Sequence, residues 1–386
     1  MTDLHESLAV TGLSVLSSAG MGKEAFFAAL AKGDATVPTP RADIKSFDAS
    51  AYDAPNIVEV RVFDPTVLLG DKGLRTLDRI TKLLIVAARM CLQDAGLKAN
   101  GEWKKSEATK VGFVCSNAYG SLEAITELDR VALLEDPRYI NPAKFPNTVS
   151  NSAAGYVSIW EDLRALNVSV SNGNPGALDA VGIAEVHLAS GRADALITGG
   201  GEAMCEALFL AFQKLGAMRA PGFCLGEGAA MVCLEPERIA DARGATIHAR
   251  VSGYGTHFAA PKDDALLHAS EEAMGAAIEQ ALERADVAAK DVDLVVAGLS
   301  GLAPFDAAEL AAIRGAVGRS ANVFAPKLLV GESLGASGAL GLVAAIHARN
   351  GGALGRIEAG HAPPRPRHTL VTSLGYYGNA SAILVS

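Results

Sequence analysis

The spacing of apolar residues divides the chain into helices and strands. Apolar positions recur every three to four residues in several segments, which predicts helices at 24–32, 78–95, 122–134, 153–164, 270–285 and 305–317. Short runs rich in aliphatic residues predict buried strands at 8–15, 111–115, 168–171, 195–201, 246–254, 293–298, 369–372 and 382–385. Residues 34–75 carry proline and aspartate with weak periodicity, so we expect a surface excursion there.

Two further segments, 176–190 and 335–348, are apolar on nearly every helical face. A helix without a polar face belongs in the interior of a fold. Each segment lies in one of two similar runs of strands and helices, and the second run starts near residue 240. We therefore expect a duplicated, layered α/β fold, with halves 1–240 and 241–386 forming one compact unit.

A strand, a tight turn and a helix meet at residues 168–180. The β-rich segment runs into the turn Asn172-Gly-Asn174, and the apolar helix follows from Pro175. Such junctions expose a nucleophile in many α/β enzymes, because the helix N-terminus favours an anion. The amide of Asn174 is not a nucleophile. Asparagine is a preferred N-cap and proline suits the first helical position, so we expect Asn174 to cap the helix, with a ligand contact as the alternative.

Composition limits the possible functions. Of the 386 residues, 49% are apolar and 20% are charged, as in a globular protein with a large core. The net charge of −9 argues against nucleic acid or an anionic membrane as a partner. No signal segment or membrane-length apolar run is evident, so we expect a cytoplasmic protein. The five cysteines form no CxxC pair, which favours buried free thiols and no metal site.

Several strings rich in glycine occur in a fixed order along the chain. They are Val10-Thr-Gly-Leu-Ser-Val-Leu-Ser, Leu77-Asp-Arg, Leu92-Gln-Asp-Ala-Gly-Leu, Ser190-Gly-Arg-Ala-Asp-Ala-Leu-Ile-Thr-Gly-Gly-Gly-Glu and Gly222-Phe-Cys-Leu-Gly-Glu-Gly-Ala-Ala. In these strings the chain resembles the β-ketoacyl synthases of the thiolase superfamily, over essentially its whole length. The resemblance implies the thiolase-like αβαβα fold, a dimer, and a Cys-His-His active site.

The chemistry of that family explains its three residues. A cysteine thiolate at a helix N-terminus takes the acyl chain as a thioester. Two histidines then donate hydrogen bonds to the malonyl thioester oxygen and stabilise the enolate that forms as CO₂ leaves. Alignment of the family motifs places Asn174 at the cysteine and Gly298 and Glu332 at the two histidines, while the family's lysine is kept as Lys327.

These replacements remove the condensing chemistry. Asn174 cannot form a thioester, and Gly298 offers no donor. An ionised Glu332 would repel both the malonyl carboxylate and the developing enolate. We therefore expect no catalytic residue and no cofactor. Glu332 is either a buried partner of Lys327 or of a neighbouring subunit, or a solvated loop charge.

The resemblance further points to the chain-length factors, which lack the cysteine and pair with an active ketosynthase. In that group one helix crosses the dimer interface and blocks the partner's acyl tunnel. The matching face here is Leu122, Ile125 and Asp129, with an ordinary interface or core stripe as the alternative. Asp129 suits a polar or polyene product. Tyr376 and Tyr377 stand in the family's closing loop, where the second is expected to narrow the pocket mouth.

We therefore expect a non-catalytic chain-length-factor subunit that shapes the tunnel of an active ketosynthase. The assembly would be a heterodimer or heterotetramer making a polyketide, polyene, aryl-polyene-like or fatty-acid-like product, with acyl carrier protein reached through the partner. Two alternatives stay open. The chain could be an acyltransferase or hydrolase with relocated residues, with Glu332 or His257 as a base, or a carrier-protein-binding scaffold.

Overall fold

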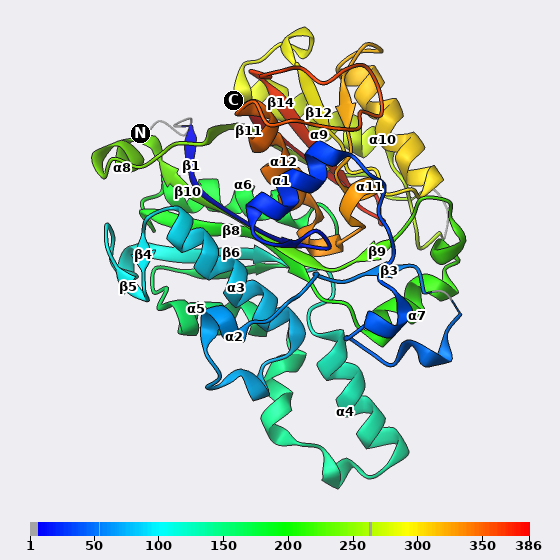
Figure 1. Ribbon diagram of the computed structural model, residues 1–386. Coiled ribbons are helices and arrows are strands. Elements are labelled where there is room, and N and C mark those ends of the chain that lie inside the picture. The colour runs from blue at the N-terminus through cyan, green and yellow to red at the C-terminus, as the bar shows by residue number, and fades with distance from the viewer. Residues whose placement is uncertain (1–6, 54, 262–264) are drawn as a thin grey trace.

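The computed structural model describes residues 7–53, 55–261 and 265–386 (Figure 1). Its first half holds strands β1 (Leu8–Ser17), β2 (Gly20–Met21), β6 (Val111–Ser116), β7 (Asn167–Val170), β8 (Ala195–Glu202) and β10 (Gly228–Pro236). Its second half holds β11 (Ala249–Phe258), β12 (Leu294–Val296), β13 (Val323–Phe324), β14 (Thr369–Leu374) and β15 (Asn379–Val385).

Within the described residues these strands form one mixed sheet in the order β13-β12-β14-β15-β11-β1-β10-β8-β6-β7, with β2 beside β1. The two halves repeat one pattern. In the first, β6 is parallel to β7 and β8, and β10 is antiparallel to β8 and β1. In the second, β12 is parallel to β13 and β14, and β15 is antiparallel to β14 and β11. The expected duplication is therefore present.

Helices separate and cover the two halves of the sheet. The two apolar segments form α6 (Gly176–Ala189) and α12 (Ser337–Arg349), which pack on each other in the interior. Helices α3 (Arg79–Asp94) and α5 (Ser152–Glu161) cover the outer face of the first half, and α9 (Glu271–Ala285) and α10 (Ala303–Ala316) cover that of the second (Figure 1). The result is the expected αβαβα order of layers.

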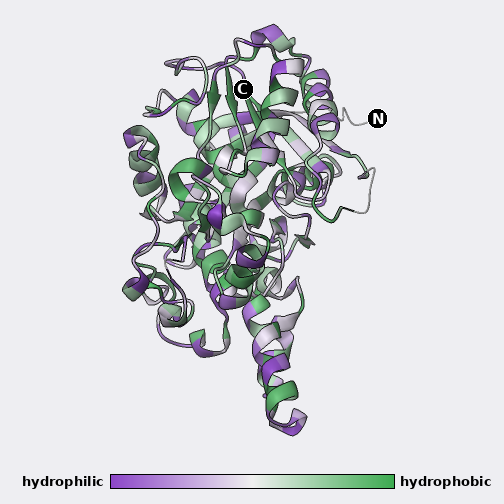
Figure 2. Ribbon diagram, turned by 90° about the vertical axis from the view of Figure 1, so that its right-hand side faces the viewer, coloured by the Kyte–Doolittle hydropathy of each residue, from purple (hydrophilic) through white to green (hydrophobic). Residues whose placement is uncertain are grey.

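The remaining elements connect these layers or pack against them. The excursion at 34–75 contains α2 (Thr66–Leu69) and β3 (Ile57–Val58), which pairs with β9 (Leu225–Gly226). The other elements are α1 (Lys23–Lys32), β4 (Lys98–Ala99), β5 (Glu102–Trp103), α7 (Glu206–Lys214), α8 (Glu237–Ala242) and α11 (Lys327–Val330). Helix α4 (Leu122–Leu134) projects away from the body (Figures 1 and 2).

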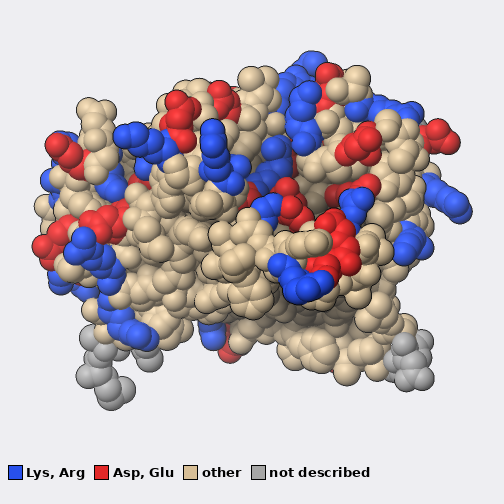
Figure 3. Space-filling view, turned by 90° about the horizontal axis from the view of Figure 1, so that it is seen from below, with Lys and Arg blue, Asp and Glu red and all other residues tan. Residues whose placement is uncertain are grey.

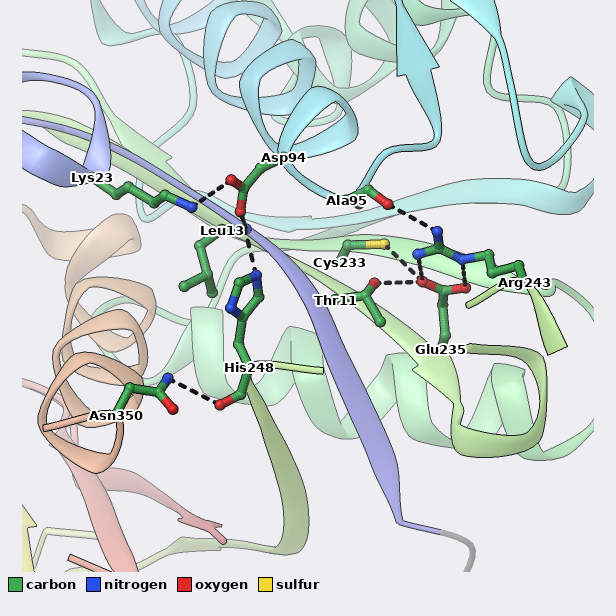
Figure 4. A network of polar contacts seen from close by, with 10 residues as sticks. All are labelled: Thr11, Leu13, Lys23, Asp94, Ala95, Cys233, Glu235, Arg243, His248 and Asn350. Carbon is green, nitrogen blue, oxygen red and sulfur yellow. Dashed lines mark hydrogen bonds and ion pairs between the residues drawn. The ribbon is translucent and has the colours of Figure 1, made fainter. Parts of the chain in front are cut away.

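Polar side chains around β1 tie the two halves together (Figure 4). Asp94 at the end of α3 pairs with Lys23 and accepts a 2.8 Å hydrogen bond from the backbone N–H of Leu13. His248 Nε2 lies 3.7 Å from the same carboxylate, and the carbonyl of His248 accepts a 3.0 Å bond from Asn350. This network joins β1 and α3 to the end of α12.

Membrane spans, metal-binding groups and cysteines were also sought. Across the described residues no helix combines the length and apolarity needed to cross a bilayer. The same residues contain no group of three or more side chains arranged to hold a metal ion. All five cysteines are free and buried, as the sequence predicted. Burial raises the pKa of Cys224 to about 12.

Candidate functional site

Glu332 is the centre of the site. It follows α11, and its carboxylate accepts five hydrogen bonds in the buried interior. Oε1 accepts from the backbone N–H of Leu334 at 2.8 Å and from Ser337 Oγ at 2.5 Å. Oε2 accepts from Lys327 Nζ at 2.7 Å, and from Asn174 Nδ2 and the Tyr376 hydroxyl at 3.2 Å each. With both oxygens occupied, the carboxylate has no free site for a substrate.

The charge of Glu332 is stabilised by its surroundings. Burial alone would raise the pKa of this carboxyl, but the Lys327 ammonium and the hydrogen bonds from Ser337 and Leu334 outweigh it, so the pKa lies below its usual value. The carboxylate also lies at the N-terminal end of α12, whose dipole favours an anion. The expected pairing with Lys327 is present, and a solvated loop charge is excluded because Glu332 is 1% exposed.

The predicted cap role of Asn174 is wrong. The residue before α6 is Pro175, which is already in the helical region (φ −69°, ψ −18°) and makes no side-chain cap. The Asn174 amide instead donates to Glu332, and its Oδ1 is buried without a hydrogen-bond partner. A charge-assisted bond across the two halves therefore replaces the local cap.

Tyr376 lies inside the site, and Tyr377 lies at its edge. Tyr376 is 7% exposed and packs edge-on against Phe305, with the ring centroids 5.0 Å apart. Burial, and then the neighbouring Glu332 charge, raise the pKa of the Tyr376 phenol. The hydroxyl of Tyr377 lies 3.0 Å from that of Tyr119, which follows β6. The sequence analysis missed Tyr119, because no local pattern relates it to Tyr377, which lies 258 positions away.

Gly298 contacts a second buried acid. Its backbone N–H donates a 2.8 Å hydrogen bond to Glu309 Oε1, and Thr372 Oγ1 donates a 2.6 Å bond to the same oxygen. A Cβ at position 298 would lie 3.2 Å from both Glu309 carboxylate oxygens. Burial raises the pKa of Glu309, against the opposing charge of Lys327. The third replaced position thus faces a carboxyl, not an open pocket.

A third buried acid, Glu202, was not anticipated. It ends β8 and accepts hydrogen bonds from the backbone N–H groups of Ala118 at 2.6 Å and Gly335 at 3.3 Å. Burial raises its pKa to about 8. The signal in the sequence is the glycine run before it: a Cβ at Gly200 would lie 1.9 Å from the Gly335 carbonyl oxygen, so only glycine permits this approach.

The predicted tunnel residues lie on α4, outside the Glu332 cluster. Leu122 is half-buried against the apolar cluster that includes Tyr376 and Leu334. Ile125 is half-buried and Asp129 is exposed. The helix is capped by Ser121, whose hydroxyl accepts a 3.3 Å bond from the N–H of Ala124.

Comparison with known proteins identifies the family of this chain. Family models described as β-ketoacyl synthase N-terminal domain and C-terminal domain match residues 5–240 and 248–356. This chain belongs to the β-ketoacyl synthase family. Among its relatives, 3-oxoacyl-(acyl-carrier-protein) synthase 2 of Coxiella burnetii is 31% identical over 362 residues, covering 87% of this chain and 84% of the relative. The corresponding synthase of Vibrio cholerae is 30% identical over 359 residues, covering 86% and 83%.

Solved structures of the family share the fold. The ishigamide ketosynthase/chain length factor superposes with a TM-score of 0.86 at 24% identity, covering 99% of each chain. A β-ketoacyl synthase from Burkholderia phymatum gives 0.83 at 22% identity, covering 98% of this chain and 99% of the other. Within the family fold, the buried Glu332 cluster occupies the junction of α6 and α12.

Proposed function

We propose that this chain is the non-catalytic, chain-length-factor-type subunit of a two-component ketosynthase. It pairs with a subunit that carries the intact catalytic residues, and it shapes that subunit's acyl tunnel. The product is a polyketide, polyene or fatty-acid-like chain, and carrier protein reaches the complex through the partner.

The observation that carries this proposal is the state of Glu332. Its carboxylate is ionised, buried and bonded to five donors from Asn174, Lys327, Leu334, Ser337 and Tyr376. Decarboxylative condensation needs a thiolate nucleophile and donors aimed at an enolate oxygen. Here the nucleophile position holds an amide, and the donors are already aimed at a fixed anion. The cluster therefore maintains structure and leaves no group to act on a thioester.

Surface features support a protein partner. Helix α4 and the segment after it expose the large apolar residues Leu133, Leu134, Tyr139 and Phe145. Strand β7 is the outermost strand at its end of the sheet in the described chain, so its outer edge is available for pairing. Seen from the α4 end, acidic and basic residues are interspersed with uncharged surface (Figure 3). A paired structural neighbour, the ishigamide ketosynthase/chain length factor, fits this assembly.

The proposed tunnel wall is the face of Leu122, Ile125 and Asp129. These residues lie between the apolar cluster around Tyr376 and the exposed end of α4. A partner docked on α4 would bring its own tunnel against this face. The polar Asp129 would then meet the growing chain at its far end, which suits a product with polar or conjugated groups.

Two measurements on purified proteins test the proposal. The tagged chain is co-expressed with the ketosynthase encoded nearby, and the complex is sized by light scattering; a 1:1 complex is expected. The chain alone is then incubated with malonyl- and acyl-carrier protein, and no carbon dioxide release or acyl-protein is expected by mass spectrometry. Failure to pair, or turnover by the chain alone, would reject the proposal.

A second candidate is an enzyme with relocated residues, and the 31% identity to a 3-oxoacyl synthase favours it. The candidate base would be Glu332. Turnover by the chain alone that disappears in Glu332→Gln would establish this second candidate.

A third possibility is a scaffold that binds carrier protein. Unchanged product length after Leu122→Ala or Ile125→Ala in the complex would favour it.

A further inference from the structure

A basic pocket lies where α12 ends, at the opposite end of this helix from Glu332. The cavity has a volume of about 390 Å³ and is lined by Arg349, Asn350, Arg365, Pro366 and Arg367. The lining contains three arginines and no acidic residue, in a chain whose net charge is −9. The volume falls in the range of small-ligand sites.

None of the three guanidinium groups forms an ion pair with a carboxylate of the described residues. Arg356, in the preceding turn, pairs with Glu358 at 2.7 Å, but Arg349, Arg365 and Arg367 have no such partner in that part of the chain. In addition, Nε of Arg349 is buried without a hydrogen-bond partner. Buried polar groups are nearly always paired, so the charge of Arg349 is not compensated by a hydrogen-bonding acceptor at this atom.

The backbone around the pocket is held in place. The Asn350 amide donates a 3.0 Å bond to the His248 carbonyl (Figure 4). Gly351 has φ +84°, and a Cβ there would lie 3.0 Å from Nε of Arg365, so this side chain packs directly over the glycine. The N–H of Arg367 donates a 2.7 Å bond to the Asp293 carboxylate. Arg349 thus ends α12, and Arg365 and Arg367 belong to the loop that follows, whose backbone is held by these contacts.

Two nearby features would repel a bound anion, the Asp293 carboxylate and the C-terminal end of α12, and both already accept hydrogen bonds from the chain. The Asp293 carboxylate accepts bonds from the N–H groups of Arg367 and His368. The negative end of the α12 dipole is satisfied in part by the N–H groups of Gly351 and Gly352, which donate to the last-turn carbonyls. Three guanidinium groups outweigh them, since arginine binds phosphate through two parallel hydrogen bonds.

We propose that this pocket binds a phosphate-type oxyanion, namely a phosphate monoester or a diphosphate group. The proposal does not depend on the role of the Glu332 cluster. The guanidinium groups of Arg365 and Arg367 would hold the anion from the loop side, and Arg349, which also lines the pocket, would approach it from the end of α12.

Calorimetric titration of the full chain tests the site, with inorganic pyrophosphate as the probe at about physiological ionic strength. Saturable 1:1 binding is expected, weakened at least about tenfold in Arg365→Gln/Arg367→Gln. The matched control is Arg356→Gln, which removes a nearby arginine outside the pocket and should leave affinity within about twofold. Thermal melts establish that each variant is folded.

Two results would overturn the proposal: no saturable binding of millimolar pyrophosphate to the wild-type chain, or an equal loss in Arg356→Gln, which would mean general charge attraction. A parallel titration with ADP separates the two sources of the same group. Tighter binding of ADP than of pyrophosphate assigns the site to a nucleotide, and equal or weaker binding assigns it to the diphosphate group itself.

Discussion

Lys327 and Glu332 form an ion pair, Nζ to Oε2 2.7 Å, whose side chains are 2% and 0% exposed. Lys327 begins α11 and Glu332 follows the turn after it, so the pair is local in sequence. Through Asn174 and Tyr376, however, the same carboxylate contacts both halves of the fold. The pair thus fixes the junction of α6 and α12.

Removing the positive partner leaves a buried, uncompensated carboxylate. We expect Lys327→Met to lower the free energy of unfolding by about 3–5 kcal/mol. The double variant Lys327→Met/Glu332→Gln should be clearly more stable than Lys327→Met, because no unpaired charge remains. Urea unfolding measures both. A Lys327→Met cost below about 1 kcal/mol would show that the pair contributes little.

Acid should weaken the same cluster. The folded pKa of Glu332 lies below its usual value, so its stabilisation is present at neutral pH and is lost as the pH falls through the folded value. The stability difference between the wild-type chain and Glu332→Gln should therefore shrink as the pH is lowered from 7 towards 3. Urea midpoints at each pH measure it, and a constant difference would contradict a lowered pKa.

Glu202 should give the opposite dependence. Its pKa is raised to about 8, whereas the unfolded chain ionises this group near 4.5. The resulting stabilisation is complete below the unfolded value and is lost as the pH rises through about 8. Relative to Glu202→Gln, the wild-type chain should lose at least about 1 kcal/mol between pH 5 and pH 8. Parallel pH profiles for the two proteins would argue against a neutral Glu202.

Access to position 174 should be limited by the tyrosine pair at the edge of the site. In Asn174→Cys we expect slow labelling by iodoacetamide, and at least about tenfold faster labelling when Tyr377→Ala is added, because the Tyr119–Tyr377 contact is removed. The control Tyr377→Phe keeps the ring. Peptide mass spectrometry separates this thiol from the five native cysteines. Equal rates in all three variants would mean that these tyrosines do not close the site.

The proposed tunnel wall can be tested in the complex. Leu122→Ala and Ile125→Ala should lengthen the product by enlarging the tunnel, read as the distribution of chain lengths by mass spectrometry. Arg130→Ala, at an exposed position of the same helix, is the matched control and should leave the distribution unchanged. A change in the control alone, or in none of the three, would remove this face from the tunnel.

Much of the fold follows from the sequence. The apolar spacing predicted α3, α9 and both central helices to within a few residues, because each buries a wide apolar surface. The site was harder to predict. Local rules favour Asn174 as a helix cap. In the structure its amide instead donates a hydrogen bond to the carboxylate of Glu332, 158 positions away. Tyr119 was missed because a contact across the fold leaves no local pattern, and for Glu202 the only local signal is the glycine run before it.

The exposed end of α4 has a consequence for the amount of this protein that accumulates in a cell. Leu133 and Leu134 are 82% and 76% exposed, and chaperones and proteases recognise such surfaces on unassembled subunits. In the proposed assembly, a chain made in excess of its partner would be removed, so the partner's supply would set its abundance. Balanced synthesis of the two subunits would then be a condition for accumulating either one.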